Sequence, residues 1–288
     1  MATMKAIKKR ITSVNSTKKI MKAMNLVATS NLQKAKSRLE YIRPLSNDLQ
    51  NVMDSVKASL DSGDEILFCK AREVKNIAYI VLTGDRGLCG SFNANVSKEA
   101  FTFIESKSDK HEKIFAVGRK GTDFFRRRGK NIEQRYPAAS VTTAYSEAEQ
   151  LGSQVIGLFL SGEVDEVHIV FTRFVNTLTH IPKIVKLLPF SAESSAEAKN
   201  ATAIMSFDPD PATFTEYAIP MYVNLTIYSA MLESAVCEYA SRMTSMDSAT
   251  RNATEIIENL TLEYNRERQG KITQELIEIV TGANAVNN

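Results

Sequence analysis

The chain is poor in the residues that metal centres, disulfide frameworks and most catalytic sites require. Among its 288 residues are three cysteines, an odd number without metal-ligand spacing, and three histidines that lie far apart. These counts argue against a disulfide framework or a zinc site and favour a reducing compartment. The sequence shows no Ser-His-Asp, His-Glu or paired-carboxylate arrangement of the kind that catalytic sites use. We therefore expect no catalytic residue, no cofactor-binding residue and no metal ligand.

Long hydrophobic runs are also missing. No stretch of about 18 or more apolar residues occurs, so we expect no membrane-spanning helix. The N-terminal residues are basic and have no apolar signal core, and because they belong to a periodic pattern we do not expect a transit peptide. The net charge is +3 with 24% charged residues, which is ordinary for a globular protein and excludes a polycation.

The longest periodic pattern runs from Pro220 to Val286. Apolar residues recur there at alternating steps of four and three, the spacing of a coiled-coil seam. After Pro220 the stretch contains no proline, and its glycines are Gly270 and Gly282. A helix of roughly 65 residues would be about 100 Å long, so it needs a partner helix. The predicted seam consists of Met221, Leu225, Tyr228, Leu232, Ala235, Tyr239, Met246, Ala249, Ala253, Ile256 and Leu260.

A second periodic pattern runs from Thr3 to about Leu60 and predicts another long helix. Two of its seam positions are polar, Lys18 and Asn25, and Pro44 predicts a kink or a joint. We expect the two terminal helices to pack antiparallel. The apolar seam positions of the first helix are Met4, Ile7, Ile11, Val14, Met21, Ala28, Leu32, Ala35, Leu39 and Ile42.

The first forty residues are strongly basic, with ten lysines and arginines against one acid, Glu40. Three interpretations are compatible with this asymmetry: a solvated helix face, a surface for an acidic partner, or a nucleic-acid surface. The scarcity of aromatic residues in this stretch argues against nucleic acid.

The middle of the chain, roughly residues 74–207, alternates predicted strands with predicted helices. Strands are expected over residues 76–83, 114–117, 166–171 and 181–188, and Pro182 places the last one at a sheet edge. Helices are expected over residues 92–106, around Phe124 and Phe125, and over residues 146–160, with Ser91 and Ser146 as N-caps. Residues 191–203 are expected to be an exposed linker.

These patterns together predict an α/β fold in three segments. Residues 1–60 form an N-terminal coiled-coil helix, residues 74–207 form a Rossmann-like α/β head, and residues 212–286 form a C-terminal coiled-coil helix. The head is inserted between the two helices of a long antiparallel coiled coil, and its sheet is expected to be largely parallel.

The glycine-rich loop at residues 84–90 is the one stretch that suggests a phosphate site. It lacks the Gly-Lys-Ser/Thr ending of a P-loop and the G-x-G-x-x-G spacing of a dinucleotide-binding turn. We therefore interpret its glycines as turn residues that present Arg86 and Leu88 outward. Cys89 is interpreted as a small packing residue, because no histidine lies near it in the sequence.

Residues in all three segments resemble the gamma subunit of F-type ATP synthases. The loop sequence DRGLCG at residues 85–90 with Phe92 and Asn93 is similar to the family's loop, and KIMKAM at residues 19–24 is similar to its first helix. The last helix carries the most specific matches. They are Glu238 with ASRM at residues 240–243, Met246, Ala249, Thr250, Asn252, Ala253, YNR at residues 264–266, Arg268, Gln269, ITQEL at residues 272–276 and EIV at residues 278–280. Cys237 and Ser245 depart from the family's usual residues but are similarly small.

The resemblance implies a non-catalytic rotor shaft, the central stalk of the ATP synthase. The stalk couples the flow of protons or sodium ions through a membrane ring to ATP synthesis or hydrolysis at the beta subunits. The implied partners are the alpha, beta and epsilon subunits, delta as a further candidate, and the ring of c subunits, with no nucleic acid and no direct small-molecule substrate. The implied location is the cytoplasmic face of the inner membrane, as a peripheral membrane protein involved in ion transport.

The resemblance also implies roles for individual residues in rotor–stator contact and coupling. Met24 and Arg242 match a coupling region of the shaft, and Arg242 occupies a seam position where a buried arginine needs a partner. Arg86, Leu88 and Cys89 match a loop that faces the lower, acidic part of beta. The apolar residues Ile277, Ile279 and Val280 match the tip. The remaining contact residues are Met246, Arg266, Arg268, Gln269, Thr273 and Gln274.

Two other classes of protein stay open on the residues alone. A nucleotide-using α/β enzyme with helical arms would bind ATP as an isolated chain. A coiled-coil scaffold or nucleic-acid-binding protein would show a steep salt-dependent affinity for DNA or RNA.

Overall fold

A computed structural model describes residues 4–59, 68, 72–143, 145–190 and 211–286. The chain divides into two compact units, one of residues 29–242 and one of residues 1–28 with 243–288. Both boundaries fall inside the long terminal helices α1 (Met4–Ser59) and α5 (Pro211–Val286). The predicted division at residues 60, 74, 207 and 212 therefore stays a prediction, and the linker over residues 191–203 lies outside the described residues.

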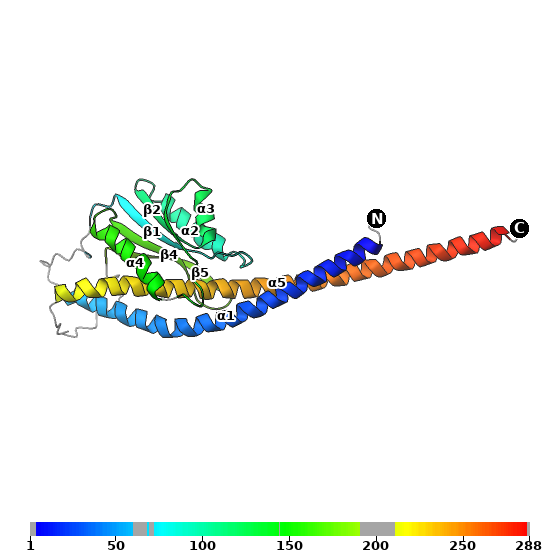
Figure 1. The fold of residues 1–288 in the computed structure, drawn as a ribbon, viewed down its shortest axis with the longest axis horizontal. Helices are drawn as coiled ribbons and strands as arrows, with labels where there is room; N and C mark the ends of the chain where they lie inside the picture. The colour runs from blue at the N-terminus through cyan, green and yellow to red at the C-terminus, as the bar shows by residue number, and fades with distance from the viewer. Residues whose placement is uncertain (1–3, 60–67, 69–71, 144, 191–210, 287–288) are drawn as a thin grey trace. The chain divides into compact units, whose positions relative to one another are not determined.

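The unit of residues 29–242 contains a five-stranded sheet in the order β3-β2-β1-β4-β5 (Figure 1). Its strands are β1 (Asn76–Leu82), β2 (His111–Val117), β3 (Ile132–Tyr136), β4 (Glu166–Phe174) and β5 (His180–Leu188). All neighbours pair in parallel except β4 and β5, which form an antiparallel edge. The α/β fold with a largely parallel sheet is confirmed, and so is the edge position of the last strand.

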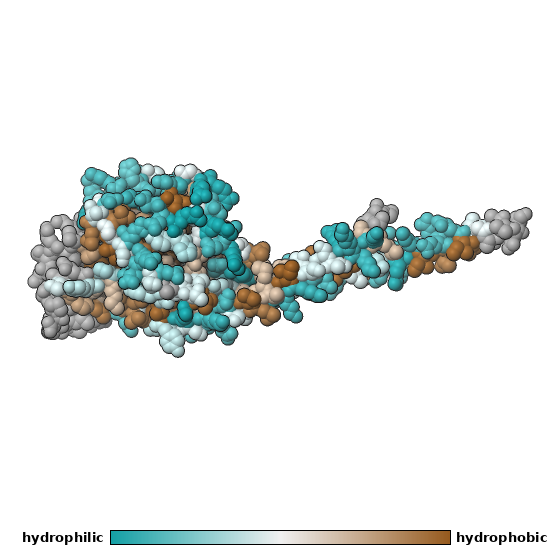
Figure 2. All heavy atoms as spheres, in the orientation of Figure 1, coloured by the Kyte–Doolittle hydropathy of each residue, from teal (hydrophilic) through white to brown (hydrophobic). Residues whose placement is uncertain are grey.

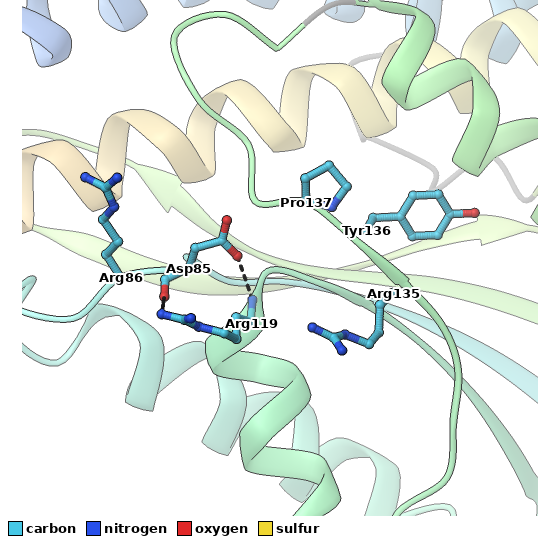
Figure 3. Close-up of a pocket in the computed structure, with 6 residues that line it drawn as sticks. All are labelled: Asp85, Arg86, Arg119, Arg135, Tyr136 and Pro137. Carbon is cyan, nitrogen blue, oxygen red and sulfur yellow. Dashed lines mark hydrogen bonds between the residues drawn. The ribbon is translucent and has the colours of Figure 1, made fainter.

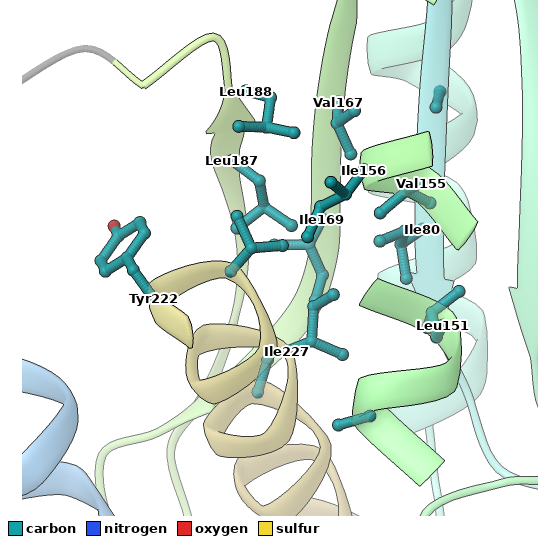
Figure 4. Packing of buried hydrophobic residues seen from close by; sticks show 14 of the residues in the cluster. Ile80, Leu151, Val155, Ile156, Val167, Ile169, Leu187, Leu188, Tyr222 and Ile227 are labelled. Atoms are coloured by element: carbon teal, nitrogen blue, oxygen red, sulfur yellow. The ribbon is translucent and has the colours of Figure 1, made fainter. Parts of the chain in front are cut away.

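Helices cover both faces of this sheet. The core on one face contains α2 (Phe92–Glu105) and α3 (Arg119–Arg126), with Val96, Ala100 and Phe125 fully buried. The core on the other face contains α4 (Tyr145–Leu160) and the first part of α5. Figure 4 shows Leu151 and Ile227 meeting side chains of β1, β4 and β5. The beginning of α5 is therefore part of the core of the head.

Each of the two terminal helices contains a proline. Helix α5 begins at Pro211, one residue before the predicted start at residue 212, and contains Pro220, where the periodic pattern begins. Helix α1 continues through Pro44, so the joint, one of the two alternatives predicted there, is not present. A proline ring can be accommodated within a helix where neighbouring packing compensates for the lost hydrogen bond.

Smaller predictions also failed for physical reasons. Strand β3 was missed because its residues IEQRY are exposed or half-buried and do not form an apolar run. Ser146 is not the N-cap of α4, because that helix already begins at Tyr145. Ser91 does occupy the N-cap position of α2, but its hydroxyl accepts a bond from the side chain of Asn95 and caps no backbone N–H.

The second unit consists of residues 4–28 and 243–286. Its buried apolar side chains occupy predicted seam positions of both helices, and the amide of Asn25 donates to the carbonyl of Met243 at 2.9 Å. The seam prediction failed at Ile256, which is 44% exposed, and at Met221 in the other unit, which is 52% exposed. The buried seam residues of this unit are Ile7, Ala28, Met246, Ala253 and Leu260.

None of the described helices combines the length and the apolar character that crossing a bilayer requires.

Candidate functional site

The loop of residues 84–90 follows β1 and is held in shape by Asn93 at the start of α2. The side-chain oxygen of Asn93 accepts the backbone N–H of Gly84 at 2.8 Å, and its amide nitrogen donates to the carbonyl of Arg86 at 3.2 Å. Leu88 adopts a left-handed backbone with φ of 62°. This conformation is costly for a leucine, and it turns the side chain outward, where it is 63% exposed.

Three side chains of α5 anchor this loop. The guanidinium of Arg242 donates to the carbonyl of Gly87 at 3.3 Å and to the carboxylate of Glu238, one turn earlier, at 2.6 Å. The hydroxyl of Ser241 donates to the carbonyl of Cys89 at 2.6 Å. The loop is thereby bound to the helix through its own backbone carbonyls, and residues 84–90 are called the anchored loop below.

Burial makes the charges of this anchor energetically important. Glu238 and Arg242 are 8% and 9% exposed. Burial raises the pKa of Glu238, and the hydrogen bond from Arg242 opposes that rise. Removing one partner of a buried ion pair usually costs more than the pair contributes, because the other charge is left without a partner. The prediction that a buried Arg242 needs a partner is confirmed by this contact.

Gly84 leaves room for the buried carboxylate. A Cβ atom added to Gly84 would lie 2.7 Å from Oε2 of Glu238, closer than side-chain carbons are found to approach. Gly87, on the same loop, has nothing within 4 Å of such an atom. The glycine at position 84 is therefore required by close packing, and the one at position 87 is not.

The three loop residues predicted to contact a partner have different environments. Arg86 is exposed, as is Leu88, so both are available to another molecule. Cys89 is only 1% exposed, and burial raises the pKa of its thiol. Its grouping with Arg86 and Leu88 as a direct contact needs correction, since its side chain faces the interior. The separate interpretation of Cys89 as a packing residue agrees with this burial.

The other predicted contact residues lie in the unit of residues 4–28 and 243–286. Met24 is half-buried and Met246 is 4% exposed, so both contribute to the seam. Further along α5 the polar side chains are exposed, and so is the apolar tip, with Ile277, Ile279 and Val280 exposed by 58% to 68%. Figure 2 shows hydrophobic spheres along this end of the helix. The exposed polar residues are Arg266, Arg268, Gln269, Thr273 and Gln274.

In the sequence, Asn93, Glu238 and Ser241 belong to motifs without a predicted role of their own, and Gly84 is interpreted only as a turn residue. A signal was present in the last helix, where Glu238, Ser241 and Arg242 place three polar residues within two turns of an otherwise apolar seam. The loop whose carbonyls accept the bonds of Ser241 and Arg242 lies far away in the sequence, so the contact between the loop and the helix could not be predicted. Within the described part of the chain, no group of three His, Cys, Asp or Glu side chains could hold a metal.

Known proteins match the chain over nearly its whole length. Residues 3–286 match the family model described as ATP synthase. The ATP synthase gamma chain of Alkaliphilus metalliredigens is 41% identical over 98% of this chain and 98% of its own length. That of Desulforamulus reducens is 42% identical over 99% of this chain and 100% of its own length. The chain belongs to the family of ATP synthase gamma chains.

As a gamma chain it is the central stalk of an ATP synthase and a non-catalytic subunit, which confirms the function predicted from the resemblance. A third relative, from Acetobacterium woodii, is 40% identical over 98% of both chains and is named a sodium ion specific ATP synthase gamma chain.

Solved structures have the same fold. A chain of the Euglena gracilis mitochondrial ATP synthase in rotational state 3 has a TM-score of 0.69 at 16% identity, covering 98% of this chain and 94% of that one. A chain of the central stalk and c-ring of the Tetrahymena thermophila enzyme has a TM-score of 0.61 at 23% identity, covering 80% of this chain and 99% of that one. At these identities the likeness extends to the fold alone.

Proposed function

We propose that this gamma chain couples rotation to catalysis through two surfaces: the anchored loop and the exposed part of α5 from residue 262 to residue 282. The partners proposed for these surfaces are the alpha and beta subunits. The head and the residues around it are proposed to bind epsilon and the ring of c subunits, with delta as a further candidate. The proposed location is the cytoplasmic face of the inner membrane, as a peripheral membrane protein.

The observation that carries this proposal is the composition of the exposed end of α5. Leu262, Ile272 and Leu276 are 69%, 48% and 57% exposed, and they are interspersed with arginines and amides. A helix that exposes large apolar side chains at this density gains stability when another surface covers them. In this proposal Arg266, Arg268, Gln269, Thr273 and Gln274 bind loops of the surrounding subunits through charge-assisted hydrogen bonds.

The anchored loop is proposed to transmit force because it is bound to α5 through buried contacts. Arg86 and Leu88 touch the beta subunit, Cys89 supports them from inside, and Arg242 holds the loop carbonyl of Gly87. Met24 and Met246 are proposed to keep the two helices in register near the coupling region. Each rotational position then favours a different set of beta conformations, a coupling free energy between distant sites.

Co-purification tests this proposal. The chain is co-expressed with the alpha subunit and an affinity-tagged beta subunit, and ATP hydrolysis is measured for the complex and for the isolated chain. We expect this chain in the eluate and hydrolysis only in the complex. Arg268→Ala/Gln269→Ala should weaken assembly or hydrolysis, whereas Glu258→Ala, an exposed change on the same helix, should not. ATP hydrolysis by the isolated chain, or a complex that excludes it, would contradict the proposal.

A further inference from the structure

Helix α3 and strand β3 carry a concentration of positive charge for which neither the fold nor the proposed coupling surfaces account. Residues 119–135 contain seven lysines and arginines against two acids, a net charge larger than the +3 of the whole chain. Figure 2 shows hydrophilic spheres over the part of the head that carries α3. The α3–β3 basic face is defined here by Arg119, Arg126 and Arg135, all of which are exposed.

Other basic residues of this stretch have partners inside the head. Arg128 lies over the ring of Phe124 at 3.6 Å from its centroid. Lys130 bridges the carboxylates of Glu105 and Glu112 at 2.7 and 2.9 Å. These contacts explain why two of the seven cations are present. Within the described part of the chain, the three arginines of the basic face form no ion pair, and the side chain of Arg119 donates to the backbone carbonyl of Asp85.

Two open hollows lie along the basic face. The first, of about 710 Å³, is lined by Asp85, Arg86, Arg119 and Arg135 together with Tyr136 and Pro137 (Figure 3). The second, of about 500 Å³, is lined by Arg126, Lys130 and Arg135 among others. Arg135 belongs to both hollows, so they form one continuous basic surface. Both are large enough to receive protruding side chains of a partner.

The backbone at this place does not offer a phosphate site. Asp85 accepts the N–H of Arg119 at 2.8 Å, and Thr83 accepts the N–H of Gly121 at 2.8 Å, so the amides at the start of α3 are already bonded. Phosphate sites at helix starts depend on such amides. Only guanidinium groups remain, and their planar forks pair with carboxylates or with phosphate oxygens, so the backbone donors that distinguish a phosphate site at a helix start are missing.

Lipid and nucleic acid also fit this surface poorly. No large hydrophobic side chain is highly exposed between residues 119 and 136, whereas helices that lie on membranes combine basic and apolar residues. Phe124 is half-buried and Phe125 is buried. Tyr136, which lines the first hollow, is also half-buried and its hydroxyl donates to Gln154, so none of these aromatic rings is exposed for stacking on bases. Arginine-rich surfaces without these features are typical of sites that bind acidic protein segments.

We propose that the α3–β3 basic face binds a segment rich in aspartate and glutamate on another protein of the assembled ATP synthase. Arg119 and Arg135 receive carboxylates in the first hollow, and Arg126 and Arg135 receive them in the second. This surface goes beyond the coupling residues of the proposed function, none of which is Arg119, Arg126 or Arg135. Its attraction is electrostatic, so it weakens as salt concentration rises.

Zero-length cross-linking in the intact complex tests this proposal. Arg126→Lys/Arg135→Lys keeps both charges and introduces amines that a water-soluble carbodiimide joins to neighbouring carboxylates. Lys98, which is exposed on α2, is the internal control. We expect residues 126 and 135 to give cross-links to acidic peptides of one other subunit at least five times more abundant than those of Lys98. Cross-links no more abundant than those of Lys98 would overturn the proposal, even in a complex whose assembly and hydrolysis are normal.

A binding experiment on the isolated chain separates the ligand classes. The probes are a peptide of twelve glutamates, vesicles containing phosphatidylserine, and a single-stranded DNA of twenty nucleotides. Arg126→Gln/Arg135→Gln should weaken glutamate-peptide binding at least fivefold, and Lys98→Gln/Lys183→Gln, with the same net charge, should leave it unchanged. Equal weakening by both pairs, or a selective loss of vesicle or DNA binding, would overturn the proposal. If the unmodified chain fails to join the complex, the proposed function itself has failed.

Discussion

The anchored loop and the end of α5 differ in how far their groups are in contact with the rest of this chain. The loop's carbonyls are bound by Ser241 and Arg242, and the charge of Arg242 is met by Glu238 within the same unit. From residue 262 onward most side chains of α5 are exposed, apolar and polar alike. The backbone of the anchored loop is bound within this chain, whereas the exposed side chains of the end of α5 gain contacts only from another molecule.

This difference indicates that a rotor subunit can transmit force through one region and contact changing partners through another. A region that transmits force needs contacts that do not depend on rotational position, so it is stabilised by buried hydrogen bonds and ion pairs. A region that slides past changing partners needs exposed side chains on a helix. Variants in the first region should therefore change the stability of the isolated chain, whereas variants in the second should change only the complex.

The largest effect is expected from the ion pair of the anchored loop. Arg242→Met leaves Glu238 buried without its cation, and it should lower the free energy of unfolding by about 3–5 kcal/mol. Denaturant unfolding of the isolated chain measures this change. Arg251→Met, which removes an exposed partner of Asp247 on the same helix, should cost less than about 1 kcal/mol. Similar losses for both variants would contradict the assignment of Arg242 to a buried anchor.

The unit of residues 29–242, which contains the anchored loop, should also be more sensitive to acid than the other unit. Burial disfavours the charged form of Glu166, but bonds from Lys186, His168 and Lys107 outweigh burial and hold its pKa at about 2. The ionised carboxylate therefore contributes its full stability above the ordinary value of 4.5, and the contribution is lost as the pH falls from there toward 2. Burial lowers the pKa of His168, so loss of stability should begin below pH 6.5.

Unfolding experiments at several pH values check this prediction. Glu166→Gln should be less stable than the unmodified chain at pH 7, by about 1–3 kcal/mol, and the difference should shrink as the pH falls below 4.5. Glu258→Gln, an exposed change on α5, should leave the pH profile as it is. A constant difference between pH 7 and pH 3 would show that the ion pairs of Glu166 do not stabilise the fold.

A smaller effect is expected from the glycine that packs against Glu238. Gly84→Ala places a methyl group 2.7 Å from the carboxylate and should cost about 1–3 kcal/mol. Gly87→Ala meets nothing within 4 Å and should change stability by less than about 0.5 kcal/mol. Thermal unfolding of the two variants side by side measures the contrast. An equal response would mean that the loop does not approach Glu238 as closely as the structure shows.

The smallest effect on the isolated chain is expected at the tip. Ile277→Ser/Ile279→Ser replaces side chains that are 60% and 68% exposed, so unfolding should change by less than about 0.5 kcal/mol. Assembly with the alpha and beta subunits, or hydrolysis by the complex, should nevertheless fall. Glu275→Ser on the same segment is the control. Unchanged assembly and unchanged hydrolysis would remove the tip from the proposed coupling surface.

The sequence predicted what depends on local pattern. Dense apolar runs predicted β1 and β4, and Pro182 predicted the edge position of β5. It could not predict β3, whose side chains are only half-buried at best and therefore leave no apolar signature. The exposed positions of Arg86 and Leu88 were predicted from the glycines around them.

The sequence alone could not predict contacts between residues that lie far apart in the chain. Arg242 was predicted to need a partner, but its bond to Gly87 joins residues 155 positions apart. Cys89 was grouped with its exposed neighbours because a linear motif does not show that the left-handed turn at Leu88 sends adjacent side chains to opposite sides. The α3–β3 basic face was missed because only β2–β3 pairing brings Arg135 beside the start of α3.

Hydrogen–deuterium exchange on the free chain and on the assembled complex tests the central contrast most directly. Amides of an exposed helix exchange through local opening, which a covering surface suppresses. We expect peptides within residues 262–282 to exchange at least tenfold more slowly in the complex, while those covering residues 238–242 change little. Equal exchange of residues 262–282 in the free chain and in the complex would contradict this expectation.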